Sequence, residues 1–242
     1  MKILIFLSAL FLCLQAQAYY IFGEAVHIGN GKAKAFADID KYGRVQKVGM
    51  AMTEGTMQGL PEHDHAEYVL RLPSVLNIPP YNHFVINWEP HGHEPDRVYT
   101  LPHFDFHFYF ITNELRQTIT CMNEDRANCL TPIAANKTPP FYVPTPEGVP
   151  LMGWHWVDPR SPEFNGQIFT ATYVYGFYKG EMTFVEPMVT REFLLAKTHV
   201  DKEVPLPVEF PHPGYYPQAY EVSFDSVRNL HMITLKNFLR AE

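Results

Sequence analysis

The chain has 242 residues, 46% of them hydrophobic and 19% charged, with a formal net charge of −7. This composition supports a packed core and excludes a largely disordered chain, and the length fits one large all-β domain or two small ones. Because the sequence has no cluster of Lys and Arg side chains and no basic helix, nucleic acid and anionic membranes are excluded as expected partners.

Residues 1–18 have the pattern of a secretory signal peptide. Lys2 supplies a positive charge, an apolar run follows it, and Ala16-Gln17-Ala18 has the small residues of a cleavage site. A lipoprotein signal at Cys13 is the alternative, but bulky residues precede this cysteine where small ones normally stand. No apolar run is long enough to span a membrane. We therefore expect an exported protein, periplasmic or secreted, whose mature chain has no integral membrane segment.

The segments that follow predict short strands, because polar and apolar residues alternate between turn signals. In the first half, the predicted strands cover residues 32–39, 44–52, 67–72 and 83–89, and helical turns are expected at residues 53–60. The turn Asp40-Lys41-Tyr42-Gly43 joins the first two strands into a hairpin.

The clearest strand covers residues 102–110, where polar and aromatic side chains alternate without a break. Successive side chains of a strand point to opposite faces, so the four phenylalanines share one face and His103, Asp105, His107 and Tyr109 share the other. The phenylalanine face predicts a core. The opposite face carries three potential metal ligands, which predicts a binding site.

The second half continues the same pattern with more proline. A short helix is expected at residues 114–122 after Asn113, and the six prolines of residues 131–150 predict an extended surface loop. Later elements are a hairpin of residues 167–178 and 181–186 that ends at Glu186-Pro187-Met188, a connection at residues 204–217, and a strand pair at residues 220–224 and 230–239. We expect residues 19–242 to form a single antiparallel β-domain, barrel or sandwich-like, with one or two short helices and long proline-rich loops.

The mature chain keeps two cysteines, Cys121 and Cys129. Disulfides persist in oxidising compartments, and seven intervening residues close easily into a loop, so we expect a bridge. Two buried free thiols are the alternative.

Side chains two apart on a strand can chelate one ion, whereas His103 and His107 lie roughly 13 Å apart and require a bend to do so. The candidate metal ligands are His91, His93, His103, His107, His155 and Glu186, with Asp105 as the candidate catalytic acid or base. Imidazole and carboxylate groups suit zinc, iron or manganese.

Other interpretations of these residues stay open. The central strand could carry a hydrogen-bonded polar network, a metal-free catalytic pocket or a solvated face. No nucleophile elbow, Walker loop, dinucleotide fingerprint or helical His-Glu-x-x-His is present, which disfavours acyl-serine and phosphate-loop chemistry. A metal-dependent hydrolase or oxidoreductase, acting on a small molecule, is slightly favoured over a binding or scaffolding protein.

Four longer stretches occur together, namely NWEPHGHEP at residues 87–95, PHFDFHFY at 102–109, MGWHWVDP at 152–159 and FVEPMVT at 184–190. Together they resemble a small family of exported bacterial proteins classed as a domain of unknown function, over residues 29–195. The resemblance implies a β-rich fold and self-assembly, so we expect a homo-oligomer. It implies no reaction, substrate or catalytic residue.

Overall fold

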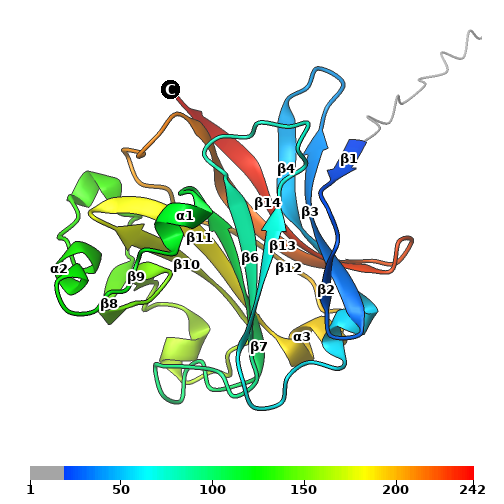
Figure 1. Ribbon diagram of the computed structural model, residues 1–242, viewed down its shortest axis with the longest axis horizontal. Helices are drawn as coiled ribbons and strands as arrows, with labels where there is room; N and C mark the ends of the chain where they lie inside the picture. Colours follow the sequence, from blue (N-terminus) through cyan, green and yellow to red (C-terminus); the bar gives the residue numbers. More distant parts are fainter. Residues whose placement is uncertain (1–18) are drawn as a thin grey trace, which may run out of the picture.

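The computed structural model describes residues 19–242, and the predicted signal peptide, with Cys13, lies outside the described residues. Within this range the fold is mainly β and consists of two antiparallel sheets that pack face to face (Figure 1). The sheets are not closed into a barrel, so the sandwich-like form of the prediction is confirmed and the barrel is not.

The first sheet, sheet A, joins both ends of the described chain. Its strands, in spatial order, are β1 (Tyr19–Phe22), β3 (Gly31–Ile39), β4 (Val45–Thr53), β14 (Leu230–Ala241), β13 (Gly214–Asp225) and β12 (Val200–Glu203), and β2 (Val26–Ile28) also pairs with β3. Figure 1 shows the blue amino-terminal strands beside the red carboxy-terminal strand β14. The predicted hairpin corresponds to β3 and β4, and the predicted final strand pair to β13 and β14.

The second sheet, sheet B, contains the segments with candidate ligands. Its strands, in spatial order, are β5 (Ala66–Arg71), β6 (His83–Glu89), β7 (His103–Tyr109), β11 (Glu181–Thr190), β10 (Ala171–Tyr178), β9 (Gly153–Val157) and β8 (Val143–Val149). Strand β7 lies between β6 and β11, so strands protect both of its edges.

The core forms on the phenylalanine face of β7, as the alternation predicts. Phe104, Phe106 and Phe108 have no exposed surface, and they share one hydrophobic cluster with Val48 and Ile233 of sheet A. The other face of β7 therefore points away from the space between the two sheets.

The helices are short and lie in the connections between strands. Within residues 19–242 the α-helices are α1 (Asn113–Arg116), α2 (Asp125–Cys129) and α3 (Arg191–Leu195), and single 3₁₀ turns cover Glu54–Met57, Ala135–Lys137 and Pro162–Asn165. There are thus three short α-helices in this range rather than one or two. None of them has the length and apolar character needed to cross a membrane.

The helix predicted at residues 114–122 stops after one turn. The Asp125 carboxylate accepts the backbone N–H groups of Thr120 and Cys121, at 2.8 and 3.0 Å. The backbone has already left the α-helix before this point, because Thr118 and Ile119 donate to carbonyls three residues earlier, and the carboxylate satisfies the next two N–H groups.

The prediction was wrong at two strands that contain proline. The loop expected at residues 131–150 contains β8, an edge strand whose register shifts between Pro144 and Gly148, and an edge with a bulge tolerates missing N–H donors. Strand β11 continues through Pro187 to Thr190 instead of ending at Glu186. Its register with β7 resumes beyond the proline, so the missing donor interrupts the ladder only locally.

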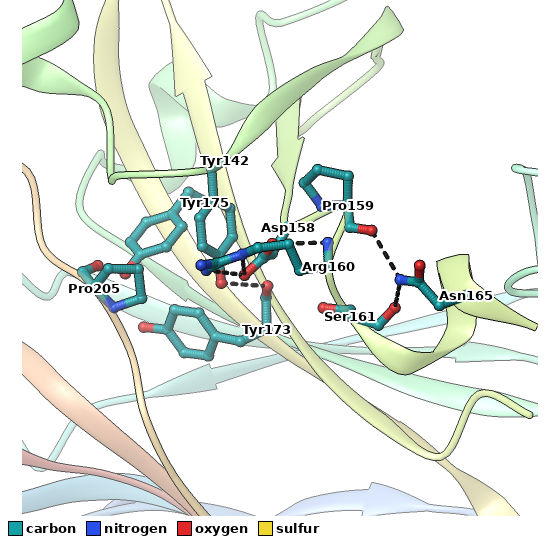
Figure 2. Close-up of polar contacts among 9 residues, drawn as sticks. All are labelled: Tyr142, Asp158, Pro159, Arg160, Ser161, Asn165, Tyr173, Tyr175 and Pro205. Atoms are coloured by element: carbon teal, nitrogen blue, oxygen red, sulfur yellow. Dashed lines mark hydrogen bonds and ion pairs between the residues drawn. The ribbon is translucent and has the colours of Figure 1, made fainter. Parts of the chain in front are cut away.

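Hydrogen bonds fix the connection that leads from β9 to β10 (Figure 2). Arg160 donates to the Asp158 carboxylate at 2.6 Å, and the Asn165 side chain donates to two backbone carbonyls of the same loop, at 3.1 and 2.9 Å. The Tyr142 hydroxyl donates to the carbonyl oxygen of Tyr173 on β10 at 3.1 Å. The contacts of Arg160 and Asn165 stabilise the loop itself, and the Tyr142 contact ties the segment before β8 to strand β10.

Candidate metal centre

The candidate site lies on the face of sheet B that points away from the core, and strand pairing assembles it. The register of β7 and β11 joins Val185 to Phe108 and Met188 to Asp105, which places Glu186 opposite His107. On β9, His155 lies opposite Gly176 of β10. Because glycine has no side chain, the His155 ring can reach across β10 toward Glu186.

The first group, the Glu186 triad, consists of His107, His155 and Glu186. The Nε2 atoms of both histidines lie 3.5 Å from the Glu186 carboxylate, His107 from Oε1 and His155 from Oε2. The His107 and Glu186 side chains are almost completely buried, and His155 is 14% exposed. Ligand atoms of the three residues thus converge in a place that is largely closed to solvent.

The second group, the Asp105 triad, consists of His93, His103 and Asp105. The two Asp105 oxygens lie 3.0 Å from His103 Nε2 and 3.6 Å from His93 Nε2. Each histidine also places Nδ1 against a backbone carbonyl, Leu101 for His103 at 2.6 Å and Glu94 for His93 at 2.7 Å. A carbonyl only accepts, so Nδ1 of each histidine carries a proton and Nε2 faces Asp105, where a metal would take the place of any proton on Nε2.

These separations fit side chains arranged around a common ion. Ligand atoms about 2.0–2.1 Å from a tetrahedral metal lie roughly 3.3 Å from one another. The contacts in the two triads range from 3.0 to 3.6 Å. Within each triad all three ligand atoms lie within 4.8 Å of one another.

Several buried polar atoms of the site have no hydrogen-bond partner among the described residues. They are His107 Nδ1 and Nε2, His155 Nδ1, Glu186 Oε2, His103 Nε2 and Asp105 Oδ1. The last two lie 3.0 Å apart but are not aligned as donor and acceptor. Buried polar groups without partners are costly, so this concentration of them points to a bound ligand.

Burial keeps both imidazoles of the Glu186 triad neutral, so that their nitrogen lone pairs are available to a metal. Burial, with the nearby His155 and Arg116, lowers the pKa of His107 to about 3, and burial with the charge of His93 lowers the pKa of His155 to about 4. Both imidazoles are therefore neutral near pH 7. Burial and the nearby Asp105 charge raise the pKa of Glu186 well above its usual range, which a cation beside it would reverse.

In the Asp105 triad, the effect of neighbouring charges on the pKa values exceeds the effect of burial. Burial acts to raise the pKa of Asp105, but the adjacent His103 and His93 outweigh it and hold that pKa well below its usual range. Burial acts to lower the pKa of His93, but Asp105 and the Glu94 carbonyl raise it to about 9. Asp105 is consequently an anion, and positive charge beside it is favoured.

Both triads open into one cavity of about 510 Å³. His93 and Asp105 from one triad, and His155 and Glu186 from the other, line it. A small molecule in the cavity would therefore contact both groups of ligands.

The rest of the cavity wall is largely apolar. Tyr99, Val174 and Met188 contribute apolar surface, and the Glu89 carboxyl adds a polar group. Burial and the Asp105 charge raise the pKa of Glu89. The arrangement is that of a small-molecule site, with convergent polar groups on an apolar wall.

A family model described as TTHB210-like, Hypothetical protein TTHB210, matches residues 40–88. This agrees with a family that has no assigned function, but the matched span ends before every member of both triads. No curated protein and no solved structure matches the chain. The argument for a site therefore depends on the side chains of this chain.

The structure brings together all but one of the residues named from the sequence. Asp105 lies among the ligand atoms rather than apart from them, and His91 belongs to neither triad. The exposed His91 ring instead stacks on His63, with ring centroids 6.1 Å apart. Glu89 is not among the candidate site residues from the sequence, although it continues the alternation of β6 in phase with the site.

The cysteines belong to neither triad. Cys121 and Cys129 form a disulfide with Cα atoms 5.4 Å apart, and they pack in a separate small cluster with Ile119 and Tyr178. The bridge therefore supports the loop after β7 and contributes no ligand.

Proposed function

We propose that the protein binds a divalent transition metal at the Glu186 triad. The observation that supports this most is the convergence of His107, His155 and Glu186 in a buried position where several of their polar atoms lack partners. Two imidazoles and one carboxylate suit zinc, iron or manganese.

We propose further that the bound metal serves catalysis. Three protein ligands leave a coordination position open, as in catalytic zinc sites, whereas structural zinc sites have four protein ligands. The adjoining cavity can receive a small molecule. Hydrolase or oxidoreductase chemistry on a small molecule fits these features, and the metal would supply Lewis acidity.

The carboxyl groups of the cavity divide between two roles. Asp105, with its low pKa, is better suited to hold a cation than to carry a proton. Glu89 lines the same cavity and has a raised pKa, which suits proton transfer to or from a bound molecule. Glu89→Gln should therefore lower turnover more than it lowers metal content.

An exported location and a homo-oligomer are part of the proposal. The disulfide is compatible with an oxidising compartment. The alternative function is a self-assembling scaffold whose histidines form a polar network. Light scattering after size-exclusion chromatography, combined with a hydrolase and oxidase screen, separates the two, because a scaffold would assemble without turnover or metal.

Calorimetric titration of chelator-stripped protein with Zn²⁺ tests the metal site. His155→Ala removes a partly exposed ligand and should weaken zinc binding at the Glu186 triad by more than about 100-fold, since even an outer partner of a ligand contributes about 10- to 100-fold. His91→Ala, an exposed histidine outside both triads, is the matched control and should bind as the wild type does. Equal binding by both variants would refute the site.

A further inference from the structure

We infer that the Asp105 triad is a second metal position, so that the chain holds two divalent ions side by side in one cavity. This inference rests on the proposed function, because it adds an ion next to the one at the Glu186 triad. The two sets of ligands share no residue, so both positions can be filled at once.

The geometry of the Asp105 triad supports a bound ion more than a simple hydrogen-bonded network. His103 Nε2 and Asp105 Oδ1 lie 3.0 Å apart, yet neither forms a hydrogen bond to the other or to another described group. Both atoms are buried. A metal ion between these two atoms would satisfy both of them, which no other described group does.

The two imidazoles are also oriented in advance. His93 and His103 each donate Nδ1–H to a backbone carbonyl, at 2.7 and 2.6 Å, which holds the ring and leaves Nε2 toward Asp105. Metal-binding histidines commonly have such a partner on the other ring nitrogen.

Strand β7 places the two positions next to each other. Asp105 and His107 point to the same face, two residues apart, which corresponds to about 6.6 Å between their Cα atoms. Asp105 and His93 line the same cavity as His155 and Glu186. Two ions there could bind neighbouring oxygen atoms of one small molecule, as two-metal hydrolytic sites do.

Charge and ligand chemistry define the class of ion. Five carboxyl side chains line the cavity, those of Glu89, Glu94, Asp105, Glu147 and Glu186, and together they offset much of the charge of two divalent cations. The ligands are nitrogen and oxygen atoms only. The expected ions are therefore zinc, manganese or ferrous iron.

The number of ions per chain tests the inference. Chelator-stripped protein is loaded with Zn²⁺, free metal is removed, and elemental analysis gives the ratio of zinc to chain. We expect two ions in the wild type and in His91→Ala, and one ion in each of His103→Ala and His155→Ala. His93→Ala, whose side chain is 39% exposed, replaces His103→Ala if circular dichroism shows that the latter is unfolded.

The other outcomes separate the inference from the proposed function. One ion in the wild type that His103→Ala retains and His155→Ala loses would overturn the second position and leave the Glu186 site intact. One ion that both variants lose would mean a single position shared by the two triads, which also overturns the inference. Absence of zinc from the wild type would refute both proposals.

Discussion

Three buried histidines of sheet B are neutral in the folded chain, because burial opposes their protonation. Burial and the Arg116 charge lower the pKa of His83 to about 4, and the pKa values of His107 and His155 are lowered to about 3 and about 4. In the unfolded chain each would have a pKa of about 6.5. The unfolded state therefore binds more protons below that pH.

This difference predicts acid sensitivity of the metal-free protein. As pH falls from about 6.5 toward 4, the unfolded chain takes up protons that the folded chain refuses, and each histidine lowers the free energy of unfolding by up to about 1.4 kcal/mol per pH unit. Urea unfolding at pH 7, 6 and 5 measures the slope. His83→Gln should make the slope shallower, whereas His199→Gln, at an exposed histidine, should not. An unchanged slope in His83→Gln would contradict the assignment.

At the scale of elements, the site depends on how β9, β10 and β11 meet around one glycine. Gly176 lies opposite His155 on β9 and Phe184 on β11. A Cβ atom at Gly176 would come within 2.0 Å of the Phe184 ring. That ring packs on both His107 and His155, with centroids 4.9 and 5.3 Å away.

Gly176→Ala should consequently disturb the Glu186 triad without changing a ligand. The added methyl group displaces the Phe184 ring, and such overpacking costs about 1–3 kcal/mol. Zinc affinity and thermal stability should fall together. Gly43→Asn, in an open turn at φ 77°, is the control: zinc affinity should stay unchanged, and thermal stability should fall only slightly because asparagine tolerates this backbone region. Wild-type zinc affinity in Gly176→Ala would show that Phe184 does not position the histidines.

The disulfide belongs to a different element and should behave differently. Removing it in the double variant Cys121→Ser and Cys129→Ser should lower the free energy of unfolding by a few kcal/mol at most, because it closes a short loop. Metal content should stay unchanged, since the bridge supplies no ligand. Loss of metal in the double variant would instead connect the α2 region to the site.

The sequence predicted the features that depend on the alternation within one strand. It did not predict which side chains meet when strands distant in the sequence pair. The alternation in residues 102–110 predicted both the core face and the ligand face of β7. It could not show that Glu186 lies opposite His107, because that depends on the register between strands separated by more than 70 residues. His91 and His93 have equivalent positions in the sequence pattern. Only the course of their loop in the structure decides that His93, and not His91, lies beside Asp105.

At the scale of the whole molecule, both sheets contribute to one hydrophobic cluster, and the first and last strands lie in the same sheet. We therefore predict that residues 19–242 unfold as one unit. Scanning calorimetry of the mature chain should show one transition whose calorimetric and van't Hoff enthalpies agree. Two separable transitions would contradict the single domain expected from the sequence.

The most direct test of the central claim is elemental analysis of the mature protein, purified without an affinity tag or chelator. We predict at least one equivalent of zinc, iron or manganese per chain, and a clear decrease in folded His107→Ala. Substoichiometric metal that His107→Ala leaves unchanged would contradict the account and would favour a polar network of histidines and carboxylates.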